Sequence, residues 1–130
     1  MKDPAAVVRL VNRAFDAEHL AEEHVFMLAC DIKGRTLGLF EVAHGIVNGC
    51  RFSSREILIR ALLVGAVQIV LVHNHPGGDP EFSKLDIDAT KYLARACAVI
   101  GIGLVDHIAV GENGWSSAAE INLAWLKGEE

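Results

Sequence analysis

Two histidines follow a strongly apolar segment and are separated by a single asparagine. His73 and His75 come directly after residues 67–72, a largely aliphatic run of the kind that forms strands buried on both faces. Side chains two apart on a strand point to the same side, so both imidazoles could reach one metal ion. A His-x-His pair at a strand end is also compatible with ordinary polar surface.

A third candidate ligand, Asp86, follows a loop that favours a sharp turn. The loop, residues 76–82, contains two glycines and two prolines and can fold the chain back before the next helix. Asp86 then falls in the first turn of that helix, where it could face His73 and His75. Two histidines and one carboxylate would leave the fourth position of a zinc ion open for water, whereas a closed structural site needs a fourth protein ligand.

The segment from Ser83 to Asp86 also has the pattern of an ordinary helix start. Ser83 is a typical N-cap residue, and Asp86 would lie favourably at the positive end of the helix dipole. Taken alone, this pattern favours a capping role, and Asp79-Pro80 would be a turn. The metal site is predicted by the joint pattern of histidine pair, Gly/Pro loop, serine and aspartate.

Helical and strand patterns alternate along the rest of the chain, which predicts an α/β fold with a mixed sheet and helices packed on it. The expected strands are residues 24–30, 35–43, a short one at 45–50, 67–72 and 103–110. The expected helices are residues 4–17, one starting at Ser53, 84–100 and 118–126, with turns at 31–34 and 111–114.

The composition limits the class of protein. A chain of 130 residues forms one domain with its own core. With 52% hydrophobic residues, either burial is unusually complete or an apolar face meets a partner, so a homodimer is a reasonable expectation. The net charge of -5 and the scattered basic residues argue against a general nucleic-acid surface.

Apolar segments, the N-terminus and the cysteines indicate where the protein is located and whether its cysteines are reduced. Its longest apolar stretch, residues 61–72, is shorter than the roughly 20 residues needed to span a bilayer. The N-terminus has no secretory pattern, so we expect a cytoplasmic protein without membrane contact. Cys30, Cys50 and Cys97 are too widely spaced for a CxxC clamp, and we expect buried, reduced thiols.

The order His73-Asn-His75, seven residues, Ser83, two residues, Asp86 resembles the HxH(x)7Sx2D core of the JAMM/MPN (JAB) metallopeptidase fold. The surrounding sequence is more similar still to the RadC family, whose loop typically reads HNHPSGDP before a serine and an aspartate. This chain departs from that loop at Gly77, which lies outside the ligand set and affects loop hydrogen bonding.

Further residues carry the same resemblance. Asp106-His107 is similar to a later Asp-His of the RadC family, and Ser54-Arg-Glu56 stands in the place of its Pro-Arg-Glu. The resemblance covers residues 21–114 and implies one MPN/JAB-type domain with a cytidine-deaminase-like mixed sheet flanked by helices. We expect an N-terminal helix in residues 1–20, a core in 21–114 and a C-terminal helix in 115–130. We also expect a standalone domain without the helix-hairpin-helix region of longer RadC proteins.

The resemblance assigns roles to the metal-site residues. It implies that His73, His75 and Asp86 bind Zn²⁺ and that Ser83 helps to stabilise a tetrahedral oxyanion. We expect His107 to be a structural or outer partner of the site rather than a ligand.

The resemblance also requires a glutamate near the start of the first core strand as general acid/base. Aligning residues 21–28 with the family's first strand places Glu23 in this role. Its neighbour Glu22 and Glu41 on the second strand are the alternatives. Such a group takes a proton from water and passes it to the leaving amine.

Three hypotheses on function follow. The first is a zinc-dependent metallopeptidase or isopeptidase of the JAMM type, with a peptide or protein substrate. The second is a non-catalytic interaction module that zinc stabilises. The third is a DNA-repair-associated protein, suggested by the RadC name, although the acidic charge balance makes direct duplex binding unfavourable.

Overall fold

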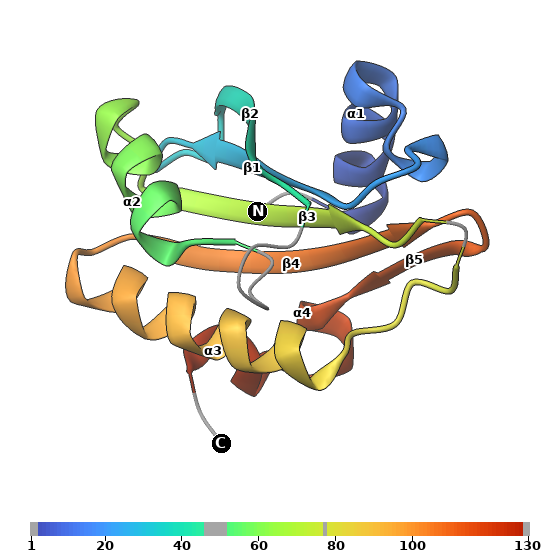
Figure 1. Ribbon diagram of the computed structural model, residues 1–130. Coiled ribbons are helices and arrows are strands. Elements are labelled where there is room, and N and C mark those ends of the chain that lie inside the picture. The colour runs from blue at the N-terminus through green and yellow to red at the C-terminus, as the bar shows by residue number, and fades with distance from the viewer. Residues whose placement is uncertain (1–2, 46–51, 77, 129–130) are drawn as a thin grey trace.

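Five strands form one mixed sheet in the order β2-β1-β3-β4-β5 (Figure 1). The computed structural model describes residues 3–45, 52–76 and 78–128. Strands β3 and β4 run parallel, and the other neighbouring pairs are antiparallel. The strands are β1 (His24–Cys30), β2 (Thr36–His44), β3 (Gln68–Asn74), β4 (Gly103–Gly111) and β5 (Gly114–Ser117). The predicted α/β class with a mixed sheet is therefore confirmed.

Helices cover both faces of the sheet, as Figure 1 shows. Helix α1 (Pro4–Phe15) packs one apolar side against one face, through Val7, Val8 and Val11. The opposite face is covered by α2 (Ser54–Leu63), α3 (Lys84–Val99) and the C-terminal segments α4 (Ala118–Ile121) and η2 (Leu123–Lys127), while η1 (Ala17–His19) follows α1. The sheet thus has a core on each side.

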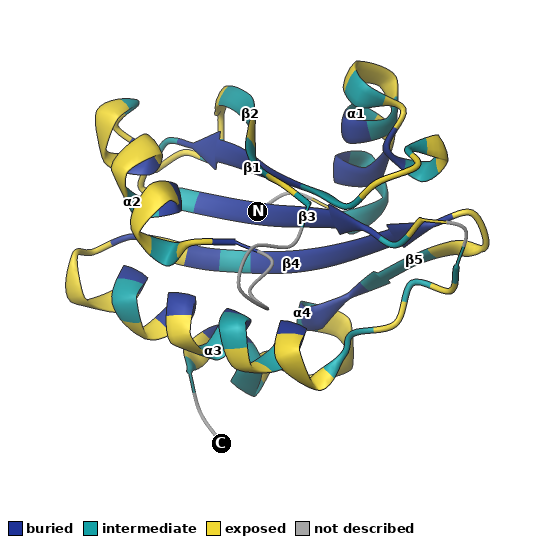
Figure 2. Cartoon of the chain, in the orientation of Figure 1, coloured by how far each residue is buried: buried dark blue, intermediate teal, exposed yellow. Residues whose placement is uncertain are grey.

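The three inner strands β1, β3 and β4 are buried along most of their length (Figure 2). Strand β3 pairs with β1 on one side and with β4 on the other, so it is the central strand. This position explains why its sequence is nearly continuous in apolar residues. Strand β3 extends to Asn74, so His73 lies within the sheet and His75 directly follows it.

The C-terminal region differs from its prediction. The predicted turn at residues 111–114 is confirmed, because it connects β4 to β5, a strand that was not predicted. We expected one continuous helix over 118–126, but two short helical segments follow β5 instead. The break falls at Asn122, whose backbone is extended with a φ of -158° and whose side chain accepts a hydrogen bond from the Ala124 N–H. A side chain that caps a new segment in this way ends the helix before it. The strand predicted at 45–50 falls largely outside the described residues.

Exposed apolar side chains gather on α2 and α3. A groove of about 540 Å³ lies between the two helices and is lined in part by Leu62, which is largely exposed. Leu63 and Val99, at the ends of the two helices, are also largely exposed. The high apolar content is therefore not fully accounted for by the core, and the homodimer stays a prediction. Within the described ranges, no helix combines the length and apolar character needed to cross a membrane.

Cys97 is a buried thiol on α3, as predicted. Burial raises the pKa of Cys97 from its ordinary value of 9.0 to about 11. The unfolded chain therefore loses this proton at a lower pH than the folded chain. We expect the contribution of Cys97 to the free energy of unfolding to be fully present below pH 9. The free energy of unfolding should then fall by about 2 to 3 kcal/mol as the pH rises to 11. Urea unfolding across this range checks the slope, which Cys97→Ala should lack.

Candidate metal centre

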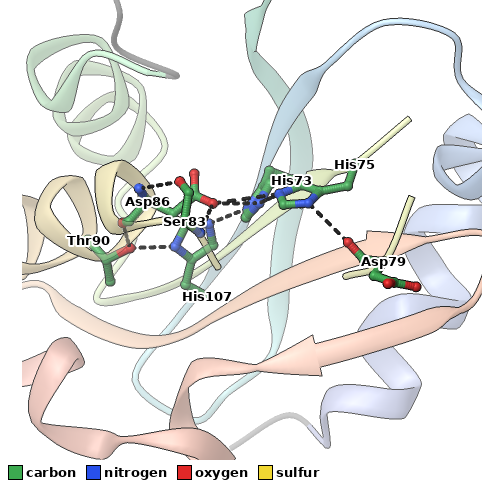
Figure 3. A network of polar contacts seen from close by, with 7 residues as sticks. All are labelled: His73, His75, Asp79, Ser83, Asp86, Thr90 and His107. Atoms are coloured by element: carbon green, nitrogen blue, oxygen red, sulfur yellow. Dashed lines mark hydrogen bonds and ion pairs between the residues drawn. The ribbon is translucent and has the colours of Figure 1, made fainter. Parts of the chain in front are cut away.

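The structure brings together the three side chains predicted to bind metal (Figure 3). The Nε2 atoms of His73 and His75 are 2.8 Å apart. The Asp86 Oδ2 atom lies 3.5 Å from the first and 3.6 Å from the second. Ligand atoms around a tetrahedral zinc ion are separated by about 3.3 Å, so this triangle has the size that zinc requires.

The donor set fits zinc in chemistry as well as in size. The three separations allow a single point to lie about 2.0 to 2.1 Å from all three atoms, the usual zinc–nitrogen and zinc–oxygen distance. The side chains of His73 and Asp86 are 1% and 0% exposed, whereas that of His75 is 18% exposed. A bound ion would therefore be shielded by His73 and Asp86 and accessible to solvent from the side of His75.

Two other groups of potential ligands occur among the described residues, and both are more exposed. One comprises His24, Glu41 and His44, and the other Asp16, Glu18 and His19. Their side chains already form ion pairs at the surface, such as that between His19 and Asp16. The buried group is the one that the sequence pattern predicted.

The cap of α3 and the metal site use the same atoms. The Asp86 N–H donates to Ser83 Oγ at 3.0 Å, and the Ser83 N–H donates to Asp86 Oδ2 at 2.9 Å, which completes a capping box. The capping and metal-binding interpretations of this segment are therefore compatible. The cap fixes the orientation of Asp86 toward the histidines. Because Ser83 Oγ accepts a hydrogen bond here, its own proton remains available for donation to a substrate.

The charge on Asp86 is maintained despite its burial. Burial raises the pKa of Asp86, but its interactions with the His73 and His75 imidazoles and a hydrogen bond from the Ser83 N–H lower it by more. The net pKa lies well below the ordinary value for an aspartate. The carboxylate is therefore ionised at neutral pH, as a metal ligand must be.

His75 is held by the loop that follows it. Its backbone N–H donates to the Val110 carbonyl at 2.7 Å, which ties the end of β3 to β4. Its ring Nδ1 lies 3.2 Å from the Asp79 carbonyl oxygen, which can only accept a hydrogen bond. The proton therefore sits on Nδ1, and the lone pair on Nε2 faces the site.

One glycine allows this loop to approach β4. A methyl group on Gly111 would lie 2.2 Å from the Gly78 carbonyl oxygen, so the loop that carries Asp79 would have to move. Since Asp79 orients His75, we expect Gly111→Ala to weaken zinc binding by about tenfold or more. Competition with a chromophoric chelator measures this change. The control is Gly103→Ala, whose methyl group would meet its nearest atom at an ordinary 3.8 Å; equal affinities for the two variants would contradict the prediction.

The predicted general base, Glu23, directly precedes β1, the strand that pairs with the strand carrying His73. Val25 of β1 pairs with His73 of β3, so Glu23, two residues before Val25, continues the same face of the sheet. Glu23, its neighbour Glu22 and Pro76, the residue after His75, line one shallow depression.

The two alternatives to Glu23 have other partners. Glu22 is exposed and pairs with His44 at 2.8 Å. Glu41 pairs with His24, and its register partner is Phe26, which belongs to the core on the α1 side of the sheet. Glu22 lines the same depression as Glu23, whereas the strand register places Glu41 on the other face of the sheet from His73.

The asparagine between the two histidines has a role that the sequence analysis missed. Asn74 is buried, accepts a hydrogen bond from the His24 N–H at 2.6 Å and donates one to the Glu22 carbonyl at 2.8 Å. These contacts hold the backbone on both sides of Glu23. Asn74 lies between two candidate ligands on a strand, so its side chain points to the opposite side from theirs. A polar residue at such a position was the one indication in the sequence that it makes contacts of its own.

The Asp-His pair of β4 supports the site from behind. Asp106 is buried and accepts hydrogen bonds from Ser117 Oγ and from the backbone N–H groups of His107 and Ala119. It thereby fastens the C-terminal segment to β4. His107 is fully buried, and its Nε2 lies 2.7 Å from Nδ1 of His73. It is a partner of a candidate ligand, as predicted, and is not a member of the ligand group.

Comparison with known proteins agrees with this geometry. Residues 1–123 match the family described as RadC-like JAB domain. A UPF0758 protein of Stenotrophomonas maltophilia is 38% identical over 121 residues, which cover 93% of this chain and 51% of the relative. A UPF0758 protein of Chlorobium phaeovibrioides is 41% identical over 101 residues, 78% of this chain and 45% of the relative. The chain spans about half the length of these curated relatives. It belongs to the RadC-like JAB domain family.

Proposed function

We propose that this protein is a zinc-dependent hydrolase that cleaves an amide bond in a peptide or protein, as JAMM-type metallopeptidases and isopeptidases do. The observation that carries the proposal is the convergence of two imidazole nitrogens and one ionised carboxylate at distances that suit zinc. A protein that used zinc only for stability would have no need of an open coordination position.

The residues around the site divide the chemistry among them. His73, His75 and Asp86 would hold the ion, which would lower the pKa of a water molecule and polarise a carbonyl group. Glu23 accepts a proton from the attacking water and delivers it to the leaving nitrogen. Ser83 donates its hydroxyl proton to the oxygen that becomes negative during the attack.

The surroundings of Glu23 are suited to an extended substrate. The depression shared by Glu23 and Pro76 is shallow and open, so a chain could lie across it with its amide bond next to the metal site. A small molecule is usually enclosed by a deeper pocket. This contrast favours a peptide or protein substrate over a small amide.

An activity assay tests the proposal. Zinc-loaded protein is incubated with a library of internally quenched peptides and with ubiquitin-type isopeptide conjugates, before and after treatment with a chelator. We expect cleavage that the chelator abolishes and that added zinc restores. Cleavage that survives complete removal of the metal contradicts the proposal, and zinc binding without cleavage of any probe favours the interaction module.

A further inference from the structure

A buried chain of hydrogen bonds connects two of the candidate zinc ligands through residues that do not belong to the ligand group (Figure 3). His73 Nδ1 lies 2.7 Å from His107 Nε2. His107 Nδ1 lies 2.6 Å from the Thr90 hydroxyl, and that hydroxyl donates to the Asp86 carbonyl at 2.7 Å. All four residues are buried.

The direction of each hydrogen bond can be derived from the Asp86 end. A carbonyl oxygen only accepts, so the single hydroxyl proton of Thr90 points to Asp86. The Thr90 oxygen must then accept from His107, whose Nδ1 carries a proton. A neutral His107 therefore has a lone pair on Nε2 and accepts a hydrogen bond from His73 Nδ1.

The same direction follows independently from the metal end. His73 can bind zinc through Nε2 only if its remaining proton is on Nδ1. That proton must be donated to His107 Nε2, which requires the proton of His107 to be on Nδ1. Both ends of this chain of hydrogen bonds therefore require the His107 proton to be on Nδ1, and every donor in it faces an acceptor.

We propose that His107 and Thr90 are positioning residues that fix His73 in the Nδ1–H tautomer, with its Nε2 lone pair directed at the metal. This inference rests on the proposed zinc site. We call the chain of hydrogen bonds from His73 through His107 and Thr90 to the Asp86 carbonyl the relay. Because the relay ends on the backbone of Asp86, it also couples the position of α3 to that of β3. Metal-binding histidines usually donate their second N–H to such a partner.

The aromatic surroundings protect the relay from water. The Phe82 ring lies 5.8 Å from the His73 ring and 5.2 Å from the His107 ring, measured between centroids. Phe52 approaches the His107 ring at 6.1 Å. In an apolar environment a hydrogen bond is stronger, and a polar group left without a partner costs more free energy. The tautomer of His107 therefore strongly determines the tautomer of His73.

Two variants of His107 separate the hydrogen bond to His73 from the volume of the ring. The amide of glutamine in His107→Gln reaches the position of Nε2, and its oxygen can accept from His73. The shorter amide in His107→Asn reaches the position of Nδ1 and can contact Thr90, but not His73. We expect zinc affinity, measured by competition with a fluorescent chelator, to fall by about 10- to 100-fold in His107→Asn and to stay near wild type in His107→Gln. Equal affinities for the two variants, whether high or low, overturn the proposal.

Nuclear magnetic resonance of the wild-type protein gives a readout that does not depend on any variant folding. Long-range ¹H–¹⁵N spectra distinguish a protonated ring nitrogen from one with a lone pair. We expect His107 to be protonated at Nδ1 and unprotonated at Nε2, with or without zinc. A proton on His107 Nε2 overturns the relay. If the wild-type protein binds no zinc, the proposed function fails, and the metal-free spectrum still decides the direction of the relay.

Discussion

Replacing Glu23 with glutamine is expected to remove amide hydrolysis and leave zinc bound. Glutamine has nearly the same size and still lines the depression next to Pro76, but its amide cannot take a proton from water. Loss of a general acid/base group typically costs about 100- to 10,000-fold in rate. The rate is measured on a cleaved library peptide, and the zinc content by plasma mass spectrometry on the same sample.

Matched variants of the neighbouring glutamates control for the loss of charge. Glu22→Gln disturbs an exposed pair with His44, and Glu41→Gln disturbs the pair with His24. Glu22→Gln removes one negative charge just before β1, and Glu41→Gln removes one in the second half of β2. Both variants should retain most of the activity. If Glu23→Gln keeps full activity and either Glu22→Gln or Glu41→Gln loses it, the glutamate replaced in the inactive variant is the acid/base group.

Removing one zinc ligand is expected to have the second large effect. His75→Ala deletes one of three donors, and it leaves the capping box of α3 intact because that box uses Ser83 and Asp86. Zinc at a thousandfold excess over its dissociation constant stabilises a protein by about 4 kcal/mol. For a domain of this size we expect zinc to raise the melting temperature of the wild type by roughly 10 to 20 °C and to leave that of His75→Ala nearly unchanged.

The control for this prediction is His44→Ala. His44 is an exposed histidine that pairs with Glu22 and belongs to the more exposed group of potential ligands. It should respond to zinc as the wild type does. If His44→Ala loses the thermal shift and His75→Ala keeps it, zinc binds to the exposed group on β1 and β2 instead.

The sequence predicted the parts of the site that depend on residue type and spacing. The apolar run before His73 indicated a central strand, and the Gly/Pro loop indicated a turn that returns Asp86 to the histidines. The structure confirms that the three side chains converge. The spacing alone did not decide between a cap and a ligand for Asp86, because the two roles use the same carboxylate.

The parts that could not be predicted depend on contacts between distant segments. The contacts of His107 with His73 and Thr90 arise from the parallel pairing of β3 with β4 and from the packing of α3 on the sheet. No local pattern shows which imidazole nitrogen will meet which partner. Strand β5 was missed because its four residues form a strand only through pairing with β4. The broken C-terminal helix depends on a single side-chain cap at Asn122.

A crystal structure of the zinc-loaded protein, with diffraction recorded on both sides of the zinc absorption edge, tests the central claim most directly. The anomalous difference map should show one strong peak within about 2.0 to 2.2 Å of His73 Nε2, His75 Nε2 and an Asp86 oxygen. A fourth position should be occupied by a water molecule. A strong peak at His24, Glu41 and His44, with none between His73 and Asp86, would contradict the account.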